Sequence, residues 1–431
     1  MKNMQSPSHA ARASHRIGFI STRFNSTDGV SLETRKWAQV LQGMGHSVYY
    51  FAGQSDQPKD ISFVVPEAHF LHPDVKAIAQ ISYKSNKRPP EITHQIHKLR
   101  GHLKDRLYKF IQKYDVELLI VENALSIPLN ISLGLALSEL IAETNMPVIG
   151  HHHDFFWERK RFLVNCIGDY LETAFPPRLP SIQHVVINSL AAFEMGKRRG
   201  INVTVIPNVM DFDNPPAPLD EYTASLRADL GIDRDEYFFL QPTRPIQRKG
   251  IEYAFELIRR LGEKVRLVIS HAGGDEGNEY TEHIKTYARL LDVQVNLVSN
   301  LISTERGTTQ DGRKIYTLGD VYPRADLVTI PSLLEGFGNA FLEAVYYHRP
   351  IFINTYTIYS IDIKPKGFRA AEFSGFVTEE TVKYVRKILK DREFVEEMTE
   401  HNYELGRQYY SFTVLEQQLQ GLLHACFSRQ R

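Results

Sequence analysis

Cysteine is scarce in this sequence of 431 residues, and its scarcity excludes two classes of site. Only Cys166 and Cys426 are present, so neither a disulfide framework nor a cysteine-ligated zinc site can form. A reducing, cytoplasmic setting is therefore expected. Net charge is missing as well, because 51 Lys and Arg balance 51 Asp and Glu. Without net charge, the chain has no overall electrostatic attraction to nucleic acid or to a membrane surface, so neither is expected as its main partner.

Long apolar runs are also lacking. The longest, such as residues 131–137, fall short of the roughly 18 residues that span a bilayer, so no transmembrane segment is predicted. The first 15 residues are polar or small and hold no signal-peptide core, so we expect residues 1–15 to be a disordered tail. No internal repeat is visible, which excludes solenoids and propellers.

Short β-type runs alternate with helical patterns from residue 16 onward, which is typical of βαβ units and parallel sheets. A proline-rich stretch beginning at Asp211 separates the expected strands into two sets, and it predicts a linker because proline cannot continue a helix or a central strand. The first set comprises residues 17–22, 48–51, 117–122, 147–153, 184–188 and 203–207, and the second comprises residues 237–242, 265–270, 294–298, 327–331 and 350–354.

The predicted fold is therefore α/β, with two doubly wound domains. We place the first domain at residues 16–212, the linker at 213–222 and the second domain at 223–404. Apolar residues near 3.6-residue spacing predict mostly helix from residue 399 to 427. The C-terminal segment, residues 405–431, could pack back on the first domain.

The first expected strand leads into a loop that contains a single glycine. Gly29 lies just before a helix expected to begin near Ser31, and such a turn lets a ligand approach backbone N–H groups. The loop does not carry the G-x-G-x-x-G pattern of dinucleotide sites, which disfavours an oxidoreductase. A plain turn between strand and helix explains this loop equally well.

A basic loop follows the first strand of the second set. Arg244 and Lys249 lie there, at the sheet edge where open α/β sheets bind ligands. An arginine fork and a lysine point charge together could neutralise a pyrophosphate without a metal. Taken alone, a basic loop of this kind is more often a solvated surface.

A strand, a glycine-containing loop and a helix follow one another over residues 327–345. The helix is expected to begin near Asn339, where free backbone N–H groups would form a cradle for an anion. Glu343 lies one turn into this helix, where a carboxylate can accept both hydroxyls of a ribose, and Glu335 lies in the loop nearer the phosphate end. Alternatively, Glu343 only complements the helix dipole and Glu335 is a surface residue.

Three consecutive histidines close the strand expected at residues 147–153. Because side chains alternate along a strand, His151 and His153 face one way and His152 the other. The three are poorly arranged as ligands of one ion, so we expect no metal site. A hydrogen-bonded polar cluster is the favoured interpretation, with Asp154 as a candidate N-cap of the next helix.

Residues 91–113 form a basic amphipathic stretch. The stretch could meet an anionic acceptor or provide peripheral contact with a membrane surface. More often, such a pattern is a solvated helix face.

Together these motifs resemble glycosyltransferase family 4, whose members are retaining enzymes of the GT-B architecture. The likeness is strongest over residues 320–350, where Glu335 and Glu343 stand as the family's E-x7-E pair. The basic loop and the Gly29 loop add to it, and the resemblance spans about residues 16–425. It implies two facing Rossmann-like domains with an interdomain cleft, and neither a cofactor nor a bound metal.

The family pattern implies roles for the matching residues, with a donor diphosphate on the basic loop and a ribose on the helix that follows the second glycine-containing loop. The residues implied to bind the donor are Gly29, Arg244, Lys249, Glu335, Gly336, Phe337, Gly338, Asn339 and Glu343. Those implied in catalysis are His153, Lys249, Arg244 and Glu335. Acceptor contacts are assigned more weakly, to Asn25, Asp28, His152 and Asp154.

The resemblance implies transfer of a hexosyl group from a UDP- or GDP-linked sugar to a hydroxyl of a small, glycan or glycolipid acceptor. Retention would be a front-face reaction in which the leaving phosphate helps to deprotonate the acceptor, in keeping with the lack of paired acid and nucleophile carboxylates. Residues 152–159 resemble members that make mannosylglucosyl-phosphoglycerate, which favours GDP-mannose and an anionic acceptor. The turn at residues 270–275 departs from the family's glycine-led turn.

Two other functions stay open at this point. One is a GT-B-fold epimerase or hydrolase of nucleotide sugars, which would act without an added acceptor. The other is a non-catalytic protein that binds a nucleotide sugar.

Overall fold

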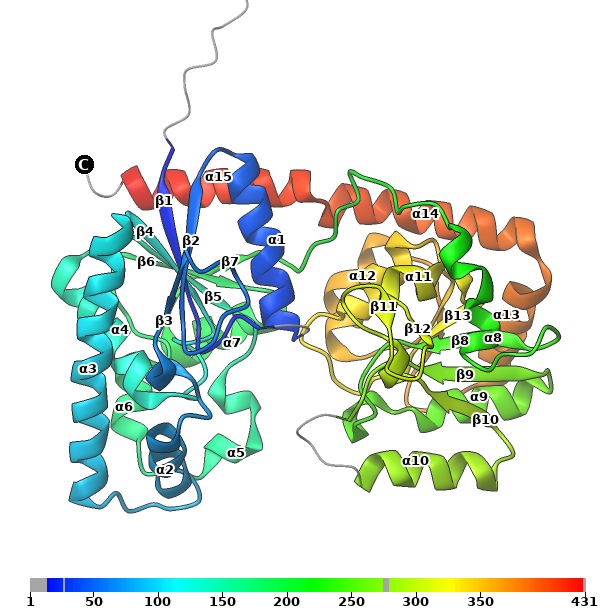
Figure 1. Ribbon diagram of the computed structural model, residues 1–431, viewed down its shortest axis with the longest axis horizontal. Helices are drawn as coiled ribbons and strands as arrows, with labels where there is room; N and C mark the ends of the chain where they lie inside the picture. Colours follow the sequence, from blue (N-terminus) through cyan, green and yellow to red (C-terminus); the bar gives the residue numbers. More distant parts are fainter. Residues whose placement is uncertain (1–13, 26–27, 274–278, 429–431) are drawn as a thin grey trace, which may run out of the picture. The chain divides into compact units, whose positions relative to one another are not determined.

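The computed structural model describes residues 14–25, 28–273 and 279–428. The chain divides into two compact units, unit 1 with Met1–Ile206 and Leu415–Arg431, and unit 2 with Pro207–Val414. Each unit is built around its own parallel sheet (Figure 1), so the predicted α/β fold with two Rossmann-like sheets is confirmed. The tail expected at residues 1–15 lies almost entirely outside the described residues.

The sheet of unit 1 has seven parallel strands in the order β3-β2-β1-β4-β5-β6-β7. The central strands β1 and β4 are apolar and buried between Arg16, which begins β1, and Glu122, which ends β4, because helices cover both faces of such a sheet. Strand β3 was not predicted, since three residues are too few to show a period. The strands are β1 (Arg16–Ile20), β2 (Ser47–Ala52), β3 (Ser62–Val64), β4 (Leu118–Glu122), β5 (Val148–His152), β6 (Ile182–Val186) and β7 (Thr204–Val205).

Helices connect these strands, and α1, α4 and α7 each begin at a side chain that accepts a backbone N–H. Asp28 accepts from the backbone N–H of Ser31 at 3.0 Å, so the first helix begins at Gly29, two residues before the expected start. Asn130 caps α4 in the same way. The helices of unit 1 are α1 (Gly29–Gly43), α2 (Pro73–Ser82), α3 (Pro90–Tyr114), α4 (Ile131–Thr144), α5 (Lys160–Leu163), α6 (Gly168–Ala174), α7 (Ser189–Arg199) and most of α15 (Phe412–Ser428).

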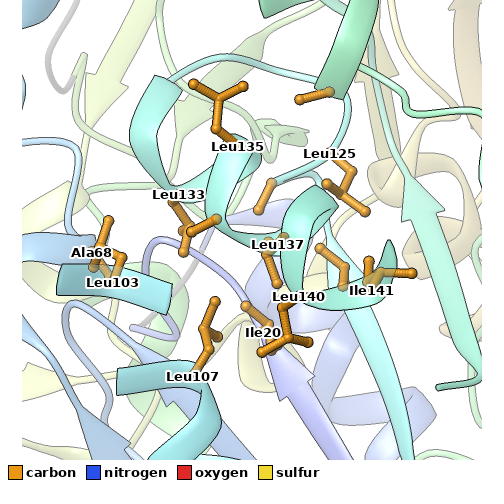
Figure 2. Close-up of a cluster of buried hydrophobic side chains, with 14 of the residues drawn as sticks. Ile20, Ala68, Leu103, Leu107, Leu125, Leu133, Leu135, Leu137, Leu140 and Ile141 are labelled. Carbon is orange, nitrogen blue, oxygen red and sulfur yellow. The ribbon is translucent and has the colours of Figure 1, made fainter. Parts of the chain in front are cut away.

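The core of unit 1 lies where α3 and α4 cover the sheet. Figure 2 shows leucines of α4 gathered with Ile20 of β1 and with Leu103 and Leu107 of α3. Each fully buried leucine contributes about 1.5–3 kcal/mol relative to an exposed one. On the polar side of the same helix pair, Arg100 and Lys104 donate to Glu139 and Glu143 at 2.5 and 2.7 Å. Part of the basic stretch at residues 91–113 is therefore paired within the unit.

The sheet of unit 2 has six parallel strands in the order β10-β9-β8-β13-β14-β15. Sequence analysis missed its edge strand β15 and a separate hairpin, β11 with β12, because all three strands are only two or three residues long. The strands are β8 (Tyr237–Gln241), β9 (Val265–Ile269), β10 (Gln294–Leu297), β11 (Gly307–Thr308), β12 (Lys314–Ile315), β13 (Leu327–Ile330), β14 (Ile351–Asn354) and β15 (Ala371–Phe373).

The helices of unit 2 include α9, whose apolar face packs on the sheet with Phe255 and Leu257 fully buried. The helices are α8 (Leu226–Asp229), α9 (Glu252–Leu261), α10 (Glu279–Leu290), α11 (Leu318–Val321), α12 (Asn339–Tyr346), α13 (Glu379–Lys390) and α14 (Arg392–Tyr410). Residues 213–220, within the expected linker, form neither helix nor strand.

The C-terminal stretch is two helices, and the prediction of helix across residues 399–427 misses the break between them. Ser411 is extended, with φ −79° and ψ 165°, so it ends α14. Its hydroxyl then accepts from the backbone N–H of Val414 at 3.3 Å and caps α15. Within the described part of the chain, none of the helices combines the length and the apolar character needed to cross a bilayer.

Candidate active site

The carboxyl ends of β4 and β5 bring three polar side chains together in unit 1. Glu122 is paired with His151 in the parallel register of these strands, so their side chains lie side by side on one face of the sheet. His153 comes two residues after His151 and returns to that face. Glu122 and His151 are fully buried, and the His153 side chain is 8% exposed.

Both imidazoles hydrogen-bond to one carboxylate. Nδ1 of His151 and Nε2 of His153 each lie 3.0 Å from Oε2 of Glu122. The backbone N–H of His153 also donates to Oδ1 of Asn123 at 2.7 Å, which fixes the chain where the strand ends. His151 stacks on Trp37 of α1, with ring centroids 4.1 Å apart. The polar cluster expected at this edge is therefore present, with Glu122 as its centre.

Charge is distributed unequally over this cluster. Burial alone would raise the pKa of Glu122, but the two imidazoles lower it to about 2. Burial lowers the pKa of His151 below its ordinary value, against the opposing effect of Glu122. Burial also acts to lower the pKa of His153, yet the hydrogen bond and charge of Glu122 raise it above its ordinary value. Glu122 is thus a carboxylate, His151 neutral and His153 the group that holds a proton most readily.

The same three residues offer donor atoms of the kind that bind metals, and these atoms lie within 4.8 Å of one another. Two hydrogen bonds from imidazole N–H groups to a carboxylate account for that spacing without an ion. The three histidines are adjacent in the sequence, whereas Glu122 lies 29 residues before His151.

His152 lies on the opposite face of the sheet, as the alternation predicts. Its Nε2 is 2.9 Å from Nδ1 of His184 on β6, and both side chains are buried. Gly150 makes room for the pair, because a Cβ there would lie 3.0 Å from the His152 ring. Burial lowers the pKa of His184 to about 4 and that of His152 well below its ordinary value, so both are neutral.

Asp154 does not cap a helix, so that prediction is wrong. The next turn begins after Phe155 and α5 begins after Arg159, and neither makes use of the Asp154 side chain. Asp154 instead accepts from Nδ2 of Asn123 at 3.3 Å and forms an ion pair with Arg159. The loop is held by these contacts because Asn123 and Asp154 follow neighbouring strands.

The loop after β1 holds the other candidates of unit 1. Asp28 is engaged as the cap of α1 and also lies 3.3 Å from Arg23, which limits its freedom to bind an acceptor. Gly29, the first residue of α1, is exposed, and Asn25 is half-buried. Gly29 is therefore placed at a helix N-terminus, where backbone N–H groups are available to a ligand.

Two loops meet at the carboxyl ends of β8 and β13 in unit 2. The backbone N–H of Leu333 donates to the carbonyl of Arg248 at 2.8 Å, and the Arg248 guanidinium donates to the carbonyl of Leu334 at 3.2 Å. Gly250 allows this approach, because φ is +56° and a Cβ would lie 2.5 Å from the carbonyl oxygen of Pro331. The basic loop and the Glu335 loop are thereby held side by side.

Lys249 and Glu335 form the ion pair at this junction. Their side chains are both 11% exposed, and Arg248 lies 3.5 Å from the same carboxylate. Burial lowers the pKa of Lys249, while the charge of Glu335 opposes that shift. The pair places a cation and an anion at the sheet edge where open α/β sheets bind ligands.

Arg244 and His271 belong to the same cationic region. Burial lowers the pKa of His271, and the charges of Arg244 and Lys249 lower it further. The His271 ring also lies 2.8 Å from the Ser270 hydroxyl. His271 occupies the turn that departs from the family pattern, of which residues 274 and 275 lie outside the described residues. Neutral His271 adds a hydrogen-bonding group beside two permanent cations.

Helix α12 begins at Asn339, as the sequence predicts. Gly338 precedes it with φ +117°, and a Cβ there would lie 2.4 Å from the Tyr356 hydroxyl, so a side chain is excluded. Phe337 is buried, and its carbonyl accepts from the Tyr356 hydroxyl at 2.7 Å. Gly336 is exposed. The Asn339 side chain accepts from Asn208 at 2.6 Å, so its backbone is the part presented at the helix start.

Glu343 lies one turn into α12 and is half-buried. Its Oε2 accepts from the hydroxyl of Tyr322 at 2.6 Å. Burial, and then the charge of Glu343, raise the pKa of Tyr322 well above its ordinary value, so this hydroxyl stays a donor. Tyr322 thus fixes one oxygen of a carboxylate expected to bind a ribose.

Sequence analysis missed Glu122, Tyr322 and His271 as members of these clusters. Glu122 had a signal, because it is the one charged residue in the otherwise apolar strand at residues 118–122. Tyr322 had none, since its partner lies 21 residues away. His271 lies in the turn that departs from the family pattern, so no motif marks it.

The chain is similar to known glycosyltransferases. Residues 223–405 match the family model "Glycosyl transferases group 1". The mannosylglucosylglycerate synthase of Petrotoga mobilis is 32% identical over 381 residues, which cover 83% of this chain and 86% of that protein. The mannosylglucosylglycerate synthase of Thermotoga maritima is 32% identical over 435 residues, covering 93% of this chain and 98% of that protein.

The fold is also found among solved structures. HepE of Anabaena, in complex with UDP-glucose, superposes with a TM-score of 0.64 at 11% identity and covers 95% of this chain and 99% of that one. At that identity the likeness concerns the fold, and it confirms the prediction of a GT-B fold.

Proposed function

We propose that this chain is a retaining enzyme of glycosyltransferase family 4 that uses a UDP- or GDP-linked hexose. The chain belongs to the glycosyl transferases group 1 family. It is a glycosyltransferase, and the proposal concerns its donor, its acceptor and its stereochemistry. One observation carries the proposal: Lys249, Glu335 and Glu343 lie at the carboxyl edge of one sheet, beside Arg244 and the start of α12.

The donor diphosphate binds to the cations of the basic loop. Lys249 exchanges its ion pair with Glu335 for the phosphates, and Arg244 adds a planar fork. The backbone at Gly338 and Asn339 supplies N–H groups, and Glu343 accepts the ribose hydroxyls while Tyr322 holds its second oxygen. With this charge supplied by side chains, we propose transfer without a bound metal.

The sugar and the acceptor follow from the names of the relatives. Both are called mannosylglucosylglycerate synthases, which suggests that a mannosyl group is joined to glucosylglycerate. We therefore propose GDP-mannose as the donor and a small anionic glycoside as the acceptor. The solved complex of HepE with UDP-glucose supports a nucleotide sugar as the class of donor.

Leaving-group stabilisation carries most of the catalysis. Arg244 and Lys249 stabilise the diphosphate as the bond to the sugar breaks, and this phosphate takes the proton of the acceptor hydroxyl on the same face. Within unit 2, Glu335 is proposed to contact the sugar from the loop ahead of α12. In unit 1, His153 is the residue proposed to face the reacting sugar. Asn25, Asp28, Gly29 and Asp154 form the proposed acceptor side of unit 1. His152 is left out, because it is buried on the other face of the sheet.

Thermal-shift screening against UDP, GDP, ADP and their sugars tests the donor, because a ligand that binds only the folded state raises the melting temperature. We expect GDP and GDP-mannose to give the largest shift. The variant Arg244→Ala should lose that shift. Arg259→Ala is the matched control, since Arg259 is an exposed arginine on α9 of the same unit.

Acceptor dependence separates transfer from the alternatives. Nucleotide release that requires glucosylglycerate supports the proposal. Sugar released or isomerised without an acceptor would indicate a hydrolase or epimerase, and binding with no turnover in any acceptor would indicate a binding protein.

A further inference from the structure

Glu122 is a buried carboxylate to which the proposed reaction gives no part. It is 1% exposed and ends β4 at the edge of the sheet in unit 1. A charged group at such a site is costly unless it is paired and hydrogen-bonded. Two imidazoles satisfy it, one of which belongs to His153, the residue expected to face the transferred sugar.

The hydrogen bond fixes how the His153 ring is turned. Nε2 lies 3.0 Å from Glu122, so this nitrogen carries a proton and points into the unit. The other ring nitrogen, Nδ1, has no hydrogen-bond partner among the described residues. A carboxylate that fixes one nitrogen of an imidazole decides what the other nitrogen offers to a ligand.

His151 braces the carboxylate from the other side. Its Nδ1 donates to Glu122, its ring stacks on Trp37, and its Nε2 is buried without a partner. A neutral imidazole fits this place, because a second buried N–H would be left unpaired. The one positive charge that balances Glu122 therefore belongs to His153.

We infer that Glu122 is a positioning residue for transfer, which holds the His153 ring by Nε2 and presents Nδ1–H at the sheet edge as a hydrogen-bond donor to the sugar. This inference rests on the proposed function, because it gives His153 a sugar to face. Glu122 itself touches no reacting atom.

All three carboxylates that face His153 raise the pKa of its ring, whereas burial and the neighbouring His151 lower it. These carboxylates are Glu122 on β4, Glu33 on α1 and Asp154 after β5, and His151 lies on β5. Among the described residues, Glu122 is the one of these three carboxylates that hydrogen-bonds to the ring, at 3.0 Å. Removing the charge of Glu122 should therefore lower the pKa of His153 more than removing the charge of Glu33 or Asp154 would.

Histidine-selective ¹⁵N NMR tests this in the free protein, with His153 assigned by the signal missing in His153→Gln. In the wild type we expect Nε2 to stay protonated and the ring to titrate above its ordinary pKa of 6.5. In Glu122→Gln we expect the pKa to fall by about one unit or more, a tenfold change in the protonated fraction. A wild-type His153 that is neutral at pH 6.5 and below, or protonated at Nδ1 alone, would overturn the inference, even if Glu122→Gln does not fold.

Kinetics separate positioning from support of the fold. We expect Glu122→Gln to lower kcat about tenfold at pH 7 and to move the basic limb of the kcat profile to lower pH, while KM for the donor is unchanged. Equal loss in kcat at every pH would indicate a structural role and would count against positioning. An unchanged kcat would overturn the inference.

The matched control is Glu117→Gln, at the residue that directly precedes β4. Glu117 is paired with His15 at 3.4 Å and is 41% exposed, so this substitution also breaks a carboxylate–histidine pair of unit 1. It should leave both the His153 signal and kcat as they are.

Two further outcomes distinguish this inference from others. If the NMR shift occurs but no nucleotide sugar turns over, the proposed function fails and the geometry of the pair stands. If a chelator abolishes activity and zinc restores it with loss of the His153 titration, the nitrogens ligate a metal and the inference is overturned.

Discussion

Each unit places a glutamate among basic side chains at the carboxyl edge of its sheet, but the partners differ in kind. Glu122 of unit 1 accepts from two imidazoles, whereas Glu335 of unit 2 pairs with Lys249 and Arg248. Imidazoles change charge between pH 5 and 8, and Lys and Arg do not. The comparison indicates that the pair in unit 2 suits a permanently charged diphosphate, while the cluster in unit 1 can hold or release one proton.

The two clusters also differ in how the backbone builds them. In unit 1, Glu122 and His151 come from paired positions of neighbouring strands. In unit 2, Lys249 and Glu335 come from loops that follow β8 and β13, and glycines permit those loops to approach. Strands fix side chains closely, whereas loops can move when a ligand arrives. We therefore expect donor binding and turnover to depend most on the charged side chains of unit 2. The properties of unit 1 should depend most on pH.

The largest expected effect is that of Lys249→Ala. Loss of the cation should lower kcat/KM about 10²- to 10³-fold, the usual cost of removing a group that stabilises a developing anion. Steady-state kinetics with the donor measure it. Lys264→Ala is the control, because Lys264 is exposed and forms an ion pair with the exposed Asp235 of the same unit. Wild-type kinetics in Lys249→Ala would contradict the donor site.

A somewhat smaller effect is expected in the stability of unit 1 as the pH falls. The pKa of His184 is about 4 in the folded state, where the ring is buried, against an ordinary value of 6.5 in the unfolded chain. The unfolded chain therefore binds the proton more tightly. Stability from this group is complete above pH 6.5 and is lost as the pH falls toward 4, by about 3 kcal/mol. Both tryptophans, Trp37 and Trp157, lie in unit 1, so urea unfolding followed by fluorescence reports this unit.

The variant His184→Phe provides the comparison for that profile. It should flatten the loss of stability between pH 6.5 and 4, because the unfolded chain no longer gains this proton. An identical pH profile in the variant and the wild type would show that His184 is not buried as a neutral ring.

Glu343→Ala should come next in size. Loss of a charged hydrogen-bond acceptor costs about 1.5–3 kcal/mol, so the donor dissociation constant should rise roughly 10- to 100-fold with a smaller change in kcat. Isothermal titration calorimetry measures the binding, with Glu256→Ala on α9 as the control at an exposed ion pair. Tight donor binding in Glu343→Ala would remove this residue from the ribose site.

Tyr322→Phe is expected to have the smallest effect. The substitution removes the 2.6 Å hydrogen bond to Glu343 and leaves the carboxylate in place but less well oriented. We expect the donor dissociation constant to rise about fivefold, for a cost of about 1 kcal/mol. The same titration checks it, and an effect larger than that of Glu343→Ala would mean that Tyr322 supports the fold rather than the carboxylate.

Much of the architecture could be predicted because helical and strand periods are local signals. The long strands of both sheets, the start of α12 and the alternation of His151, His152 and His153 all follow from such periods. The break at Ser411 was missed although a serine is a common N-cap, because the apolar period continues across it.

The candidate sites were predictable in unit 2 and only partly so in unit 1. Lys249 and Glu335 lie in segments that carry family motifs, so the sequence marks both members of the pair. Glu122 and His153 meet only through the parallel register of β4 and β5, and that register is not written in either segment alone. Pairings between strands are long-range, and one sequence gives no direct signal for them.

Acceptor-dependent transfer with retention is the central claim, and ¹H NMR of the reaction tests it most directly. GDP-mannose and glucosylglycerate are incubated with the enzyme, and the anomeric proton of the product is followed together with free GDP. We predict one product, with the anomeric configuration of the donor, and GDP release only when the acceptor is present. A product of inverted configuration, or free mannose formed at the same rate without the acceptor, would contradict the account.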